Sequence, residues 1–152
     1  MAIRNIVQVG DSVLRKRCFE VTEFNTKLFQ LLDDMKDTLI DECGAGLAAP
    51  QVGILRRAVI INLEEGYFEL INPEIVSVKG AKTDYEGCLS IRGKKGMVTR
   101  PTEVKVKAFN RYGKAIKLTA RDFFARAVCH ELDHLDGILY IDKAESLESD
   151  EK

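Results

Sequence analysis

The sequence predicts an α+β fold, with antiparallel β-strands packed around a C-terminal helix and a second long helix near the N-terminus. Apolar residues recur every three or four positions between 25 and 42, which is the period of an amphipathic helix. Short β-branched and apolar runs, separated by turn residues, fill 58–119, as is typical of antiparallel sheets. A His-Glu-x-x-His segment at 130–134 brings its two histidines onto one face if it is helical.

The first helix is predicted over 25–42. Its apolar face consists of Leu28, Leu31, Leu32, Met35 and Leu39. Asn25 and Thr26 are favourable N-cap residues, and Gly44 is expected to end the helix. Residues 1–24 mix short apolar runs with turn formers, and we expect an irregular arm with at most one helical turn.

Residues 43–53 are unusual for a connecting loop because nearly all of them are small or apolar. Glycines such as Gly44 and Gly46 let the backbone approach a ligand closely and leave N–H and C=O groups available for pairing. The same composition also suits a tight turn in the core, and the residues alone leave both interpretations open. Gln51 adds a neutral hydrogen-bond donor near the end of the segment.

Strands are predicted through the middle of the chain, at 58–62, 68–72, 74–79, 98–100, 103–110 and 114–119. Pro73 is expected to end a strand because it has no N–H to donate, and residues 111–113 are expected to form a hairpin turn. Thr119, with Asp122 three residues later, resembles a capping box that opens the last helix. Gly137 is expected to end that helix.

Length and composition favour one domain over 1–144, followed by a polar tail at 145–152 that we expect to be disordered. The formal net charge of −1 provides no global field that would attract nucleic acid or an anionic membrane. No apolar run reaches the roughly 18 residues of a membrane helix, and no signal-peptide pattern is present, so we expect a cytoplasmic protein. The four cysteines lack a short paired spacing, which favours free thiols.

The His-Glu-x-x-His segment at 130–134 contains both histidines of the chain. In a helix, His130 and His134 lie about 40° apart on one face, one turn from each other, and can hold one metal ion. Glu131 falls about 20° from Phe124, within the apolar stripe of the same helix. A buried carboxylate needs a partner, a proton or a cavity, and a metal site offers all three. A chance motif on a surface helix is the alternative.

A catalytic metal usually has three protein ligands and one open position. The chain has no third histidine, and Tyr140 stands where some zinc peptidases have one. Glu145 and Glu148 are weak candidates in the polar tail. Cys88 follows a glycine and, as a thiolate, would be a strong ligand. Cys129 is disfavoured because it lies about 100° around the helix from the first histidine.

Three separated segments together resemble the peptide deformylase family. Residues 44–51 read Gly-Ala-Gly-Leu-Ala-Ala-Pro-Gln, residues 86–90 read Glu-Gly-Cys-Leu-Ser, and residues 130–134 read His-Glu-Leu-Asp-His. Their order and spacing match, and the resemblance covers nearly the whole chain. It implies a metal-dependent hydrolase that removes the N-formyl group from the N-terminal formyl-methionine of newly synthesised polypeptides and releases formate.

The resemblance also implies roles for individual residues. Cys88, His130 and His134 would hold one divalent metal ion, with iron(II) expected and zinc, nickel or cobalt able to substitute. Glu131 would act as general acid and base. The metal assignment makes the C-terminal helix of the predicted fold a metal-binding helix.

By the same resemblance, Gln51 and the backbone N–H of Leu89 would stabilise the oxyanion, and Gly46 would pair with the substrate backbone. The other substrate-binding positions are predicted at Gly44, Ala45, Glu86, Phe123 and Ala127. The expected partner is an N-formylmethionyl peptide or nascent chain, with transient ribosome contact. We expect no membrane contact and no direct nucleic-acid site.

The chain departs from the family pattern after the cysteine, where Ile-Pro-Gly is usual and Ile-Arg-Gly stands at 91–93. Arg92 belongs to the densest basic cluster in the sequence, with Lys94, Lys95 and Arg100. A solvated loop and a substrate contact are equally good interpretations of this cluster. The departure puts peptide preference in doubt but leaves the reaction type unaffected.

Two other functions fit some of these observations. A metallo-amidase acting on a different N-acyl substrate would use the same residues. A structural metal module without catalytic activity would need four closed ligands, whereas the chain offers three good ones beside a costly buried Glu131.

Overall fold

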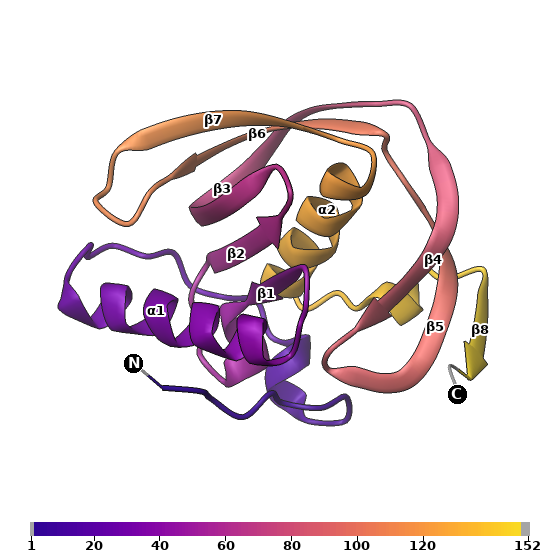
Figure 1. Cartoon of the computed structure of the whole chain (residues 1–152), viewed down its shortest axis with the longest axis horizontal. Coiled ribbons are helices and arrows are strands. Elements are labelled where there is room, and N and C mark those ends of the chain that lie inside the picture. The colour runs from indigo at the N-terminus through magenta and orange to yellow at the C-terminus, as the bar shows by residue number, and fades with distance from the viewer. Residues whose placement is uncertain (1, 150–152) are drawn as a thin grey trace.

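The structure is a computed structural model that describes residues 2–149, and its strands form two antiparallel sheets (Figure 1). The larger sheet has the order β1-β2-β3-β6-β7 and the smaller one has the order β4-β5-β8. The strands are β1 Gly46–Ala48, β2 Ala58–Leu63, β3 Gly66–Lys79, β4 Lys82–Cys88, β5 Ile91–Arg100, β6 Glu103–Phe109, β7 Ala115–Arg121 and β8 Ser146–Ser149. The helices are α1 Thr26–Asp41 and α2 Phe123–Leu135, with 3₁₀ turns at Ser12–Arg15, Ala49–Val52 and Tyr140–Asp142. The predicted fold class is confirmed.

Strand β2 is buried on both faces because it lies between the two helices. Its side chains alternate, so that Val59 and Ile61 pack into the cluster that contains the apolar face of α2, whereas Ala58 and Ile60 pack into the cluster around α1. The larger sheet therefore separates two apolar cores. Neither of the helices in the described part of the chain combines the length and apolar character that a membrane crossing requires.

Helix α1 begins as the sequence predicts, with the Asn25 side chain accepting a hydrogen bond from a first-turn N–H. The helix ends at Asp41, one residue before the predicted end, but Gly44 is not the residue that ends it. Cys43, with φ at 54°, adopts the left-handed conformation, and its N–H donates to the Ile40 carbonyl while the Gly44 N–H donates to the Leu39 carbonyl. This is a Schellman-type end. Gly44 instead lies close to side chains of the core, since a Cβ there would be 2.8 Å from Leu39 Cδ1.

The two strands predicted on either side of Pro73 are one strand, β3, so the expected break was wrong. The pairing of β3 with β6 shifts register between Ile71 and Glu74, and Asn72 at this irregularity has φ at 50°. The Asn72 side chain pairs with both backbone groups of Val21. A bulge tolerates a residue that cannot donate to the ladder, so the proline interrupts the register without ending the strand.

The predicted disordered tail differs from the structure at Ser146–Ser149, which form β8 and pair with β5. Backbone pairing to a free sheet edge requires no apolar side chains, and this explains how a polar segment becomes a strand. Gly96 on β5 makes the close approach possible, because a Cβ there would lie 2.6 Å from the Ser146 carbonyl oxygen. Residues 150–152 of the predicted tail lie outside the described residues.

The capping box predicted at the start of α2 was wrong. Thr119 lies within β7, and Asp122 precedes the helix with φ at 57° and no side-chain cap. The Asp122 N–H instead donates to the Thr102 carbonyl, 2.8 Å away, in the connection between β5 and β6. A contact distant in sequence therefore places the first turn of α2.

The predicted end of α2 at Gly137 is confirmed. Gly137 has φ at 75°, its N–H donates to the His134 carbonyl, and the next N–H, of Ile138, donates to the Asp133 carbonyl. The glycine also lies against the N-terminal arm, since a Cβ would be 2.5 Å from the Arg15 carbonyl oxygen. Both backbone conformation and packing therefore require glycine here.

We expect Gly137→Ala to lower the free energy of unfolding more than Gly93→Ala does. Both glycines have nearly the same positive φ, 75° and 77°, but nothing lies within 4 Å of a Cβ at Gly93. Gly93→Ala should therefore cost about 1 to 2 kcal/mol from backbone conformation alone, and Gly137→Ala at least about 1 kcal/mol more, since backbone must shift. Urea denaturation measures both. Equal losses would contradict the packing role of Gly137.

Candidate metal centre and active site

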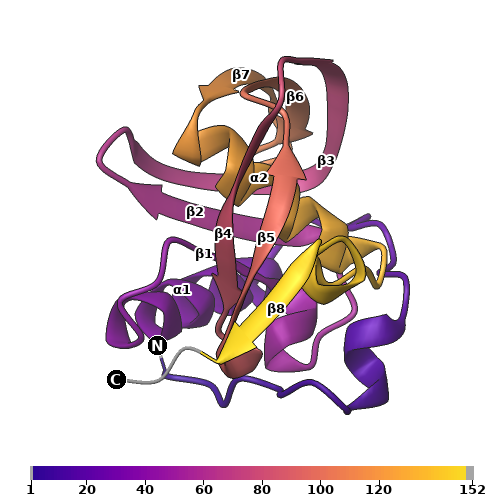
Figure 2. The same cartoon turned by 90° about the vertical axis from the view of Figure 1, so that its right-hand side faces the viewer.

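The two histidines of α2 contact β4 of the smaller sheet, through Glu86 and Cys88, and this sheet lies in front of α2 in Figure 2. His130 and His134 are buried, one helical turn apart, with ring centroids separated by 5.0 Å. The opposite stripe of α2, with Phe124 and Val128, packs into the core of the larger sheet. Burial of that stripe fixes the rotation of the helix and directs the imidazoles toward the end of β4.

Cys88 ends β4 and lies beside these imidazoles. Its Sγ is 3.4 Å from His134 Nε2, and one ligand atom from each of Cys88, His130 and His134 lies within 4.8 Å of the others. Among the described residues, this is the only group of His, Cys, Asp and Glu side chains close enough to share a metal ion. Cys129 is buried and does not belong to this group.

Glu86 orients the first histidine. Its Oε1 lies 2.7 Å from His130 Nδ1, which leaves Nε2 of that ring as the nitrogen available to a metal. Burial alone would raise the pKa of Glu86, but hydrogen bonds from His130 and Arg100 outweigh it and lower that pKa to about 2. The carboxylate is therefore charged, and it fixes which nitrogen of His130 carries the proton.

Two buried arginines hold this carboxylate in turn. Arg100 Nε and Arg126 Nη1 each lie 2.7 Å from Glu86 Oε2, and Arg100 also contacts Asp133 at 2.7 Å. Two cations and two anions compensate each other, which a buried network requires. Sequence reasoning missed both arginines as site residues. Arg126 lies four residues before His130 on the same helix face, and that spacing was the available signal.

The donor set fits a divalent cation. Burial alone would lower the pKa of His130, but hydrogen bonds to Cys88 and Glu86 hold it well above its ordinary value, so the space between these groups favours positive charge, and a bound cation would take the place of the proton on Nε2. Burial lowers the pKa of His134 well below its ordinary range and keeps that ring neutral, as a ligand must be. Two imidazoles and a thiolate suit Zn(II), Fe(II), Ni(II) or Co(II).

Glu131 lies against β1 and is buried, as the helical wheel predicts. A Cβ at Gly46 would lie 2.8 Å from Glu131 Oε2, so only glycine leaves room for this carboxyl group. Glu131 Oε1 is buried without a hydrogen-bond partner among the described residues. Burial raises the pKa of Glu131 to about 7. The group can therefore exchange a proton near neutral pH.

Gln51 is held from both ends of its amide. Its Oε1 accepts a hydrogen bond from the Ala48 N–H at 3.0 Å, and its Nε2 donates to Ser90 Oγ at 3.1 Å and lies 3.5 Å from Cys88 Sγ. The side chain is buried. These contacts hold its amide nitrogen beside the Cys88 thiol and leave the side chain little freedom to rotate.

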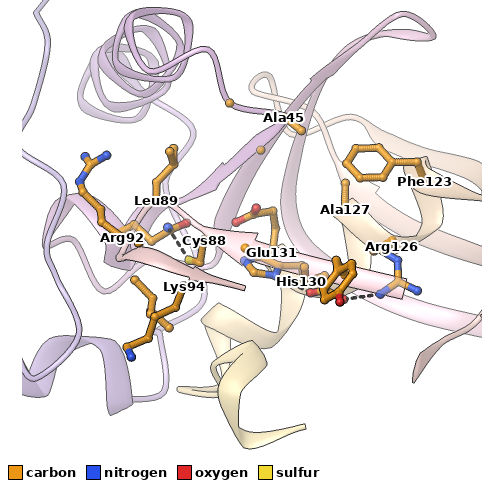
Figure 3. A pocket seen from close by; sticks show the side chains of 18 residues that line it. Ala45, Cys88, Leu89, Arg92, Lys94, Phe123, Arg126, Ala127, His130 and Glu131 are labelled. Atoms are coloured by element: carbon orange, nitrogen blue, oxygen red, sulfur yellow. Dashed lines mark hydrogen bonds and ion pairs between the residues drawn. The ribbon is translucent and has the colours of Figure 1, made fainter. Parts of the chain in front are cut away.

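A cavity of about 400 Å³ joins these groups. Figure 3 shows Cys88, Glu131 and His130 between Phe123 and Ala127 at one end and Arg92 at the other. His134 is buried and does not line this cavity. All the other predicted site residues do: Gly44, Ala45, Gly46, Gln51, Glu86, Cys88, Leu89, Phe123, Ala127, His130 and Glu131. The Glu86 carboxylate is occupied by Arg100, Arg126 and His130, and its substrate contact stays a prediction.

The cavity also lies between two free sheet edges. Strands β1 and β4 are the outer strands of their sheets, and residues of both line the cavity, including Gly46 and Glu86. Free strand edges present unpaired N–H and C=O groups that an extended peptide can pair with. The site is therefore shaped for a peptide bound along a strand edge.

The comparisons with known proteins agree with this geometry. The polypeptide deformylase family profile matches residues 3–150. A peptide deformylase of Caldicellulosiruptor bescii is 53% identical over 152 residues, covering 100% of this chain and 92% of that protein. Peptide deformylase 1 of Clostridium acetobutylicum is 52% identical and covers 94% of this chain and 95% of that protein.

Solved structures extend the agreement to the fold. The crystal structure of a peptide deformylase from Thermotoga maritima has a TM-score of 0.93 at 36% identity, covering 96% of this chain and 100% of that one. One from Synechococcus elongatus in complex with actinonin has a TM-score of 0.91 at 38% identity, covering 94% of this chain and 79% of that one. The chain therefore belongs to the polypeptide deformylase family.

Proposed function

We infer that the chain is a metal-dependent hydrolase that removes the N-formyl group from the N-terminal formyl-methionine of newly synthesised polypeptides and releases formate. The convergence of Cys88 from β4 with His130 and His134 from α2, beside buried Glu131 in one cavity, carries this inference. Membership of the polypeptide deformylase family supports the same reaction.

Cys88, His130 and His134 are the residues that would hold the metal ion, and we propose iron(II) as its identity. Their mixed sulfur and nitrogen donors are compatible with iron and with zinc, nickel or cobalt. When bound, such an ion supplies Lewis acidity, which polarises a carbonyl oxygen and lowers the pKa of water toward neutrality.

Glu131 is proposed to move the proton of the reaction. As the attacking water bonds to the formyl carbon, Glu131 takes a proton from it. When the carbon–nitrogen bond breaks, the same carboxyl group gives the proton to the departing amine. A pKa of about 7 suits both directions of transfer, and the unpartnered Oε1 is free to accept that proton.

Gln51 and the backbone N–H of Leu89 are proposed to donate hydrogen bonds to the oxygen that gains negative charge. Gln51 is supported by its position, because its Nε2 lies near Cys88 Sγ and its Oε1 is held by the Ala48 N–H. Leu89 directly follows the proposed thiolate ligand and lines the same cavity. Preorganised donors of this kind stabilise the transition state without reorganisation.

The apolar end of the cavity is proposed to bind the methionine side chain. Ala45, Phe123 and Ala127 line that end, and the free edges of β1 and β4 would pair with the peptide backbone through residues such as Gly44 and Gly46. We further propose that residues 1–144, together with the strand Ser146–Ser149 that pairs with β5, act as a single catalytic domain in the cytoplasm and that transient ribosome contact brings nascent chains to the cavity.

The protein purified without oxygen is expected to contain about one divalent ion per chain and to release formate from formyl-Met-Ala-Ser. Cys88→Ala should lose both properties, because it removes a ligand. Cys129→Ala is the matched control, since Cys129 adjoins His130 in sequence but lies outside the ligand group, and it should retain both. Metal analysis and a formate assay provide the measurements.

Two outcomes would change these assignments. Equal hydrolysis of formyl and acetyl methionyl peptides would favour a broader N-acyl amidase. Activity that survives air without nickel substitution would contradict iron(II), since ferrous iron beside a thiolate is readily oxidised.

Glu131→Gln is expected to reduce kcat by about 10³- to 10⁴-fold, the upper part of the range for a general acid–base group, while metal content stays unchanged. The amide has nearly the same shape but cannot accept and return the proton. Steady-state kinetics and metal analysis on the same sample measure the two properties. Full turnover by this variant would refute the assigned role.

Gln51→Ala should reduce kcat by about 10²- to 10³-fold, as the loss of one oxyanion donor typically does. Ser90→Ala serves as the comparison because Ser90 Oγ accepts a hydrogen bond from Gln51 Nε2 and so positions the proposed donor without being one, and a smaller loss is expected. Circular dichroism checks folding of both variants. A larger effect from Ser90 than from Gln51 would argue against the oxyanion role.

A further inference from the structure

The basic cluster that follows the cysteine is divided by the fold. Arg100 is buried against Glu86 and Asp133, and Lys95 lies over the Tyr85 ring, with its Nζ 4.6 Å from the ring centroid. Arg92 and Lys94 are exposed and line the same cavity as the proposed metal ligands. Two of the four cations are therefore available to a molecule bound in that cavity.

The cavity has chemically different ends. Figure 3 shows Phe123 and Ala127 at one end, Arg92 and Lys94 near the turn between β4 and β5 at the other, and Cys88 between them. The first end is apolar apart from Arg126, whose charge is paired with Glu86, and it suits the methionine side chain. The second end is basic. A ligand that extends through the cavity to this end therefore passes close to the positive charges of Arg92 and Lys94.

Nearby carboxylates do not cancel this charge completely. Arg92 Nη1 contacts Glu42 Oε1, the C-cap residue of α1, at 3.1 Å. The side chains are 52% and 28% exposed, so water screens the pair and its partner can be exchanged at little cost. No ion pair joins Lys94 to another side chain within residues 2–149. Glu86 is neutralised by its arginines.

The free edge of β4 leads from the cavity toward these cations. Strand β4 ends at Cys88, Leu89 and Ser90 form the turn, and Arg92 and Lys94 lie in the first half of β5. A peptide whose methionine occupies the apolar end, and whose backbone pairs along this edge, continues toward the opposite end. Each residue of an extended peptide advances by about 3.3 Å, so the first few residues after methionine pass the basic end.

We propose that Arg92 and Lys94 select formyl-methionyl peptides that carry an acidic side chain within the first few residues after the methionine. The proposal rests on the proposed function and adds a substrate preference to it. Arg92 stands where the family pattern has proline, so its part in this preference belongs to this chain's own sequence. Glu42 competes with the peptide carboxylate for Arg92 and limits the preference.

The test uses two matched peptide series, formyl-Met-Ala-Xaa-Ser and formyl-Met-Xaa-Ala-Ser, in which Xaa is Glu, Gln or Lys. At low salt, kcat/KM should be about two- to fivefold higher for Glu than for Gln in at least one series, as expected for one screened ion pair. Lys should be the poorest. The ratio should approach one in about 0.5 M salt, where exposed charges are screened.

Variants separate the contributions of the charges. Arg92→Gln, Arg92→Pro and Lys94→Gln should each lower the ratio of Glu to Gln, and the double variant Arg92→Gln with Lys94→Gln should abolish it. Glu42→Gln should raise the ratio, because it releases Arg92 from its competing carboxylate. Lys117→Gln, on β7 and outside the cavity lining, is the control and should leave the ratio unchanged.

Binding of the product peptides Met-Ala-Glu-Ser, Met-Glu-Ala-Ser and their Lys counterparts, measured by calorimetry, tests the preference without turnover. Tighter binding of an acidic peptide by a protein that hydrolyses none of the formyl series would support the charge preference and overturn the proposed function. A ratio of one in wild type for both series, or a ratio that the double variant preserves, would overturn the preference while leaving the function intact.

Discussion

The hydrogen bond between Glu86 and His130 is the contact on which the site depends. Cys88 belongs to the smaller sheet, whereas both histidines belong to a helix packed on the larger one. Glu86 lies two residues before Cys88 on β4. Its 2.7 Å contact with His130 Nδ1 joins the smaller sheet to helix α2 at the place where the cysteine and the histidines meet. The same bond sets the orientation of the imidazole, so position and protonation are determined together.

Such a bond is stable only because its charge is compensated. Arg100 and Arg126 both contact Glu86, and Asp133 contacts Arg100, which leaves no buried charge in this group without a partner. Breaking a buried network of this kind costs more than forming it contributes, because the remaining charge is left desolvated. The network therefore holds the centre in one arrangement.

Small residues then bring the reactive groups close together. The absence of a side chain at Gly46 leaves space for Glu131, and a Cβ at Gly44 would meet Leu39 and Leu89. The segment that the sequence left open between a substrate contact and a core turn packs into the core and also borders the cavity. Its strand β1 packs against the core through Leu47 and borders the cavity through Gly46.

The sequence by itself determined the features that depend on local periodicity and on residue chemistry. The apolar stripe gave the extent of α1 closely, the helical spacing paired His130 with His134, and the lack of a third histidine directed attention to Cys88. Only the tertiary structure decided the roles of Arg100 and Arg126, the pairing of β8, the bulge at Pro73 and the start of α2. Each of these features depends on a partner distant in sequence. Local propensity carries no information about a hydrogen bond to a residue tens of positions away.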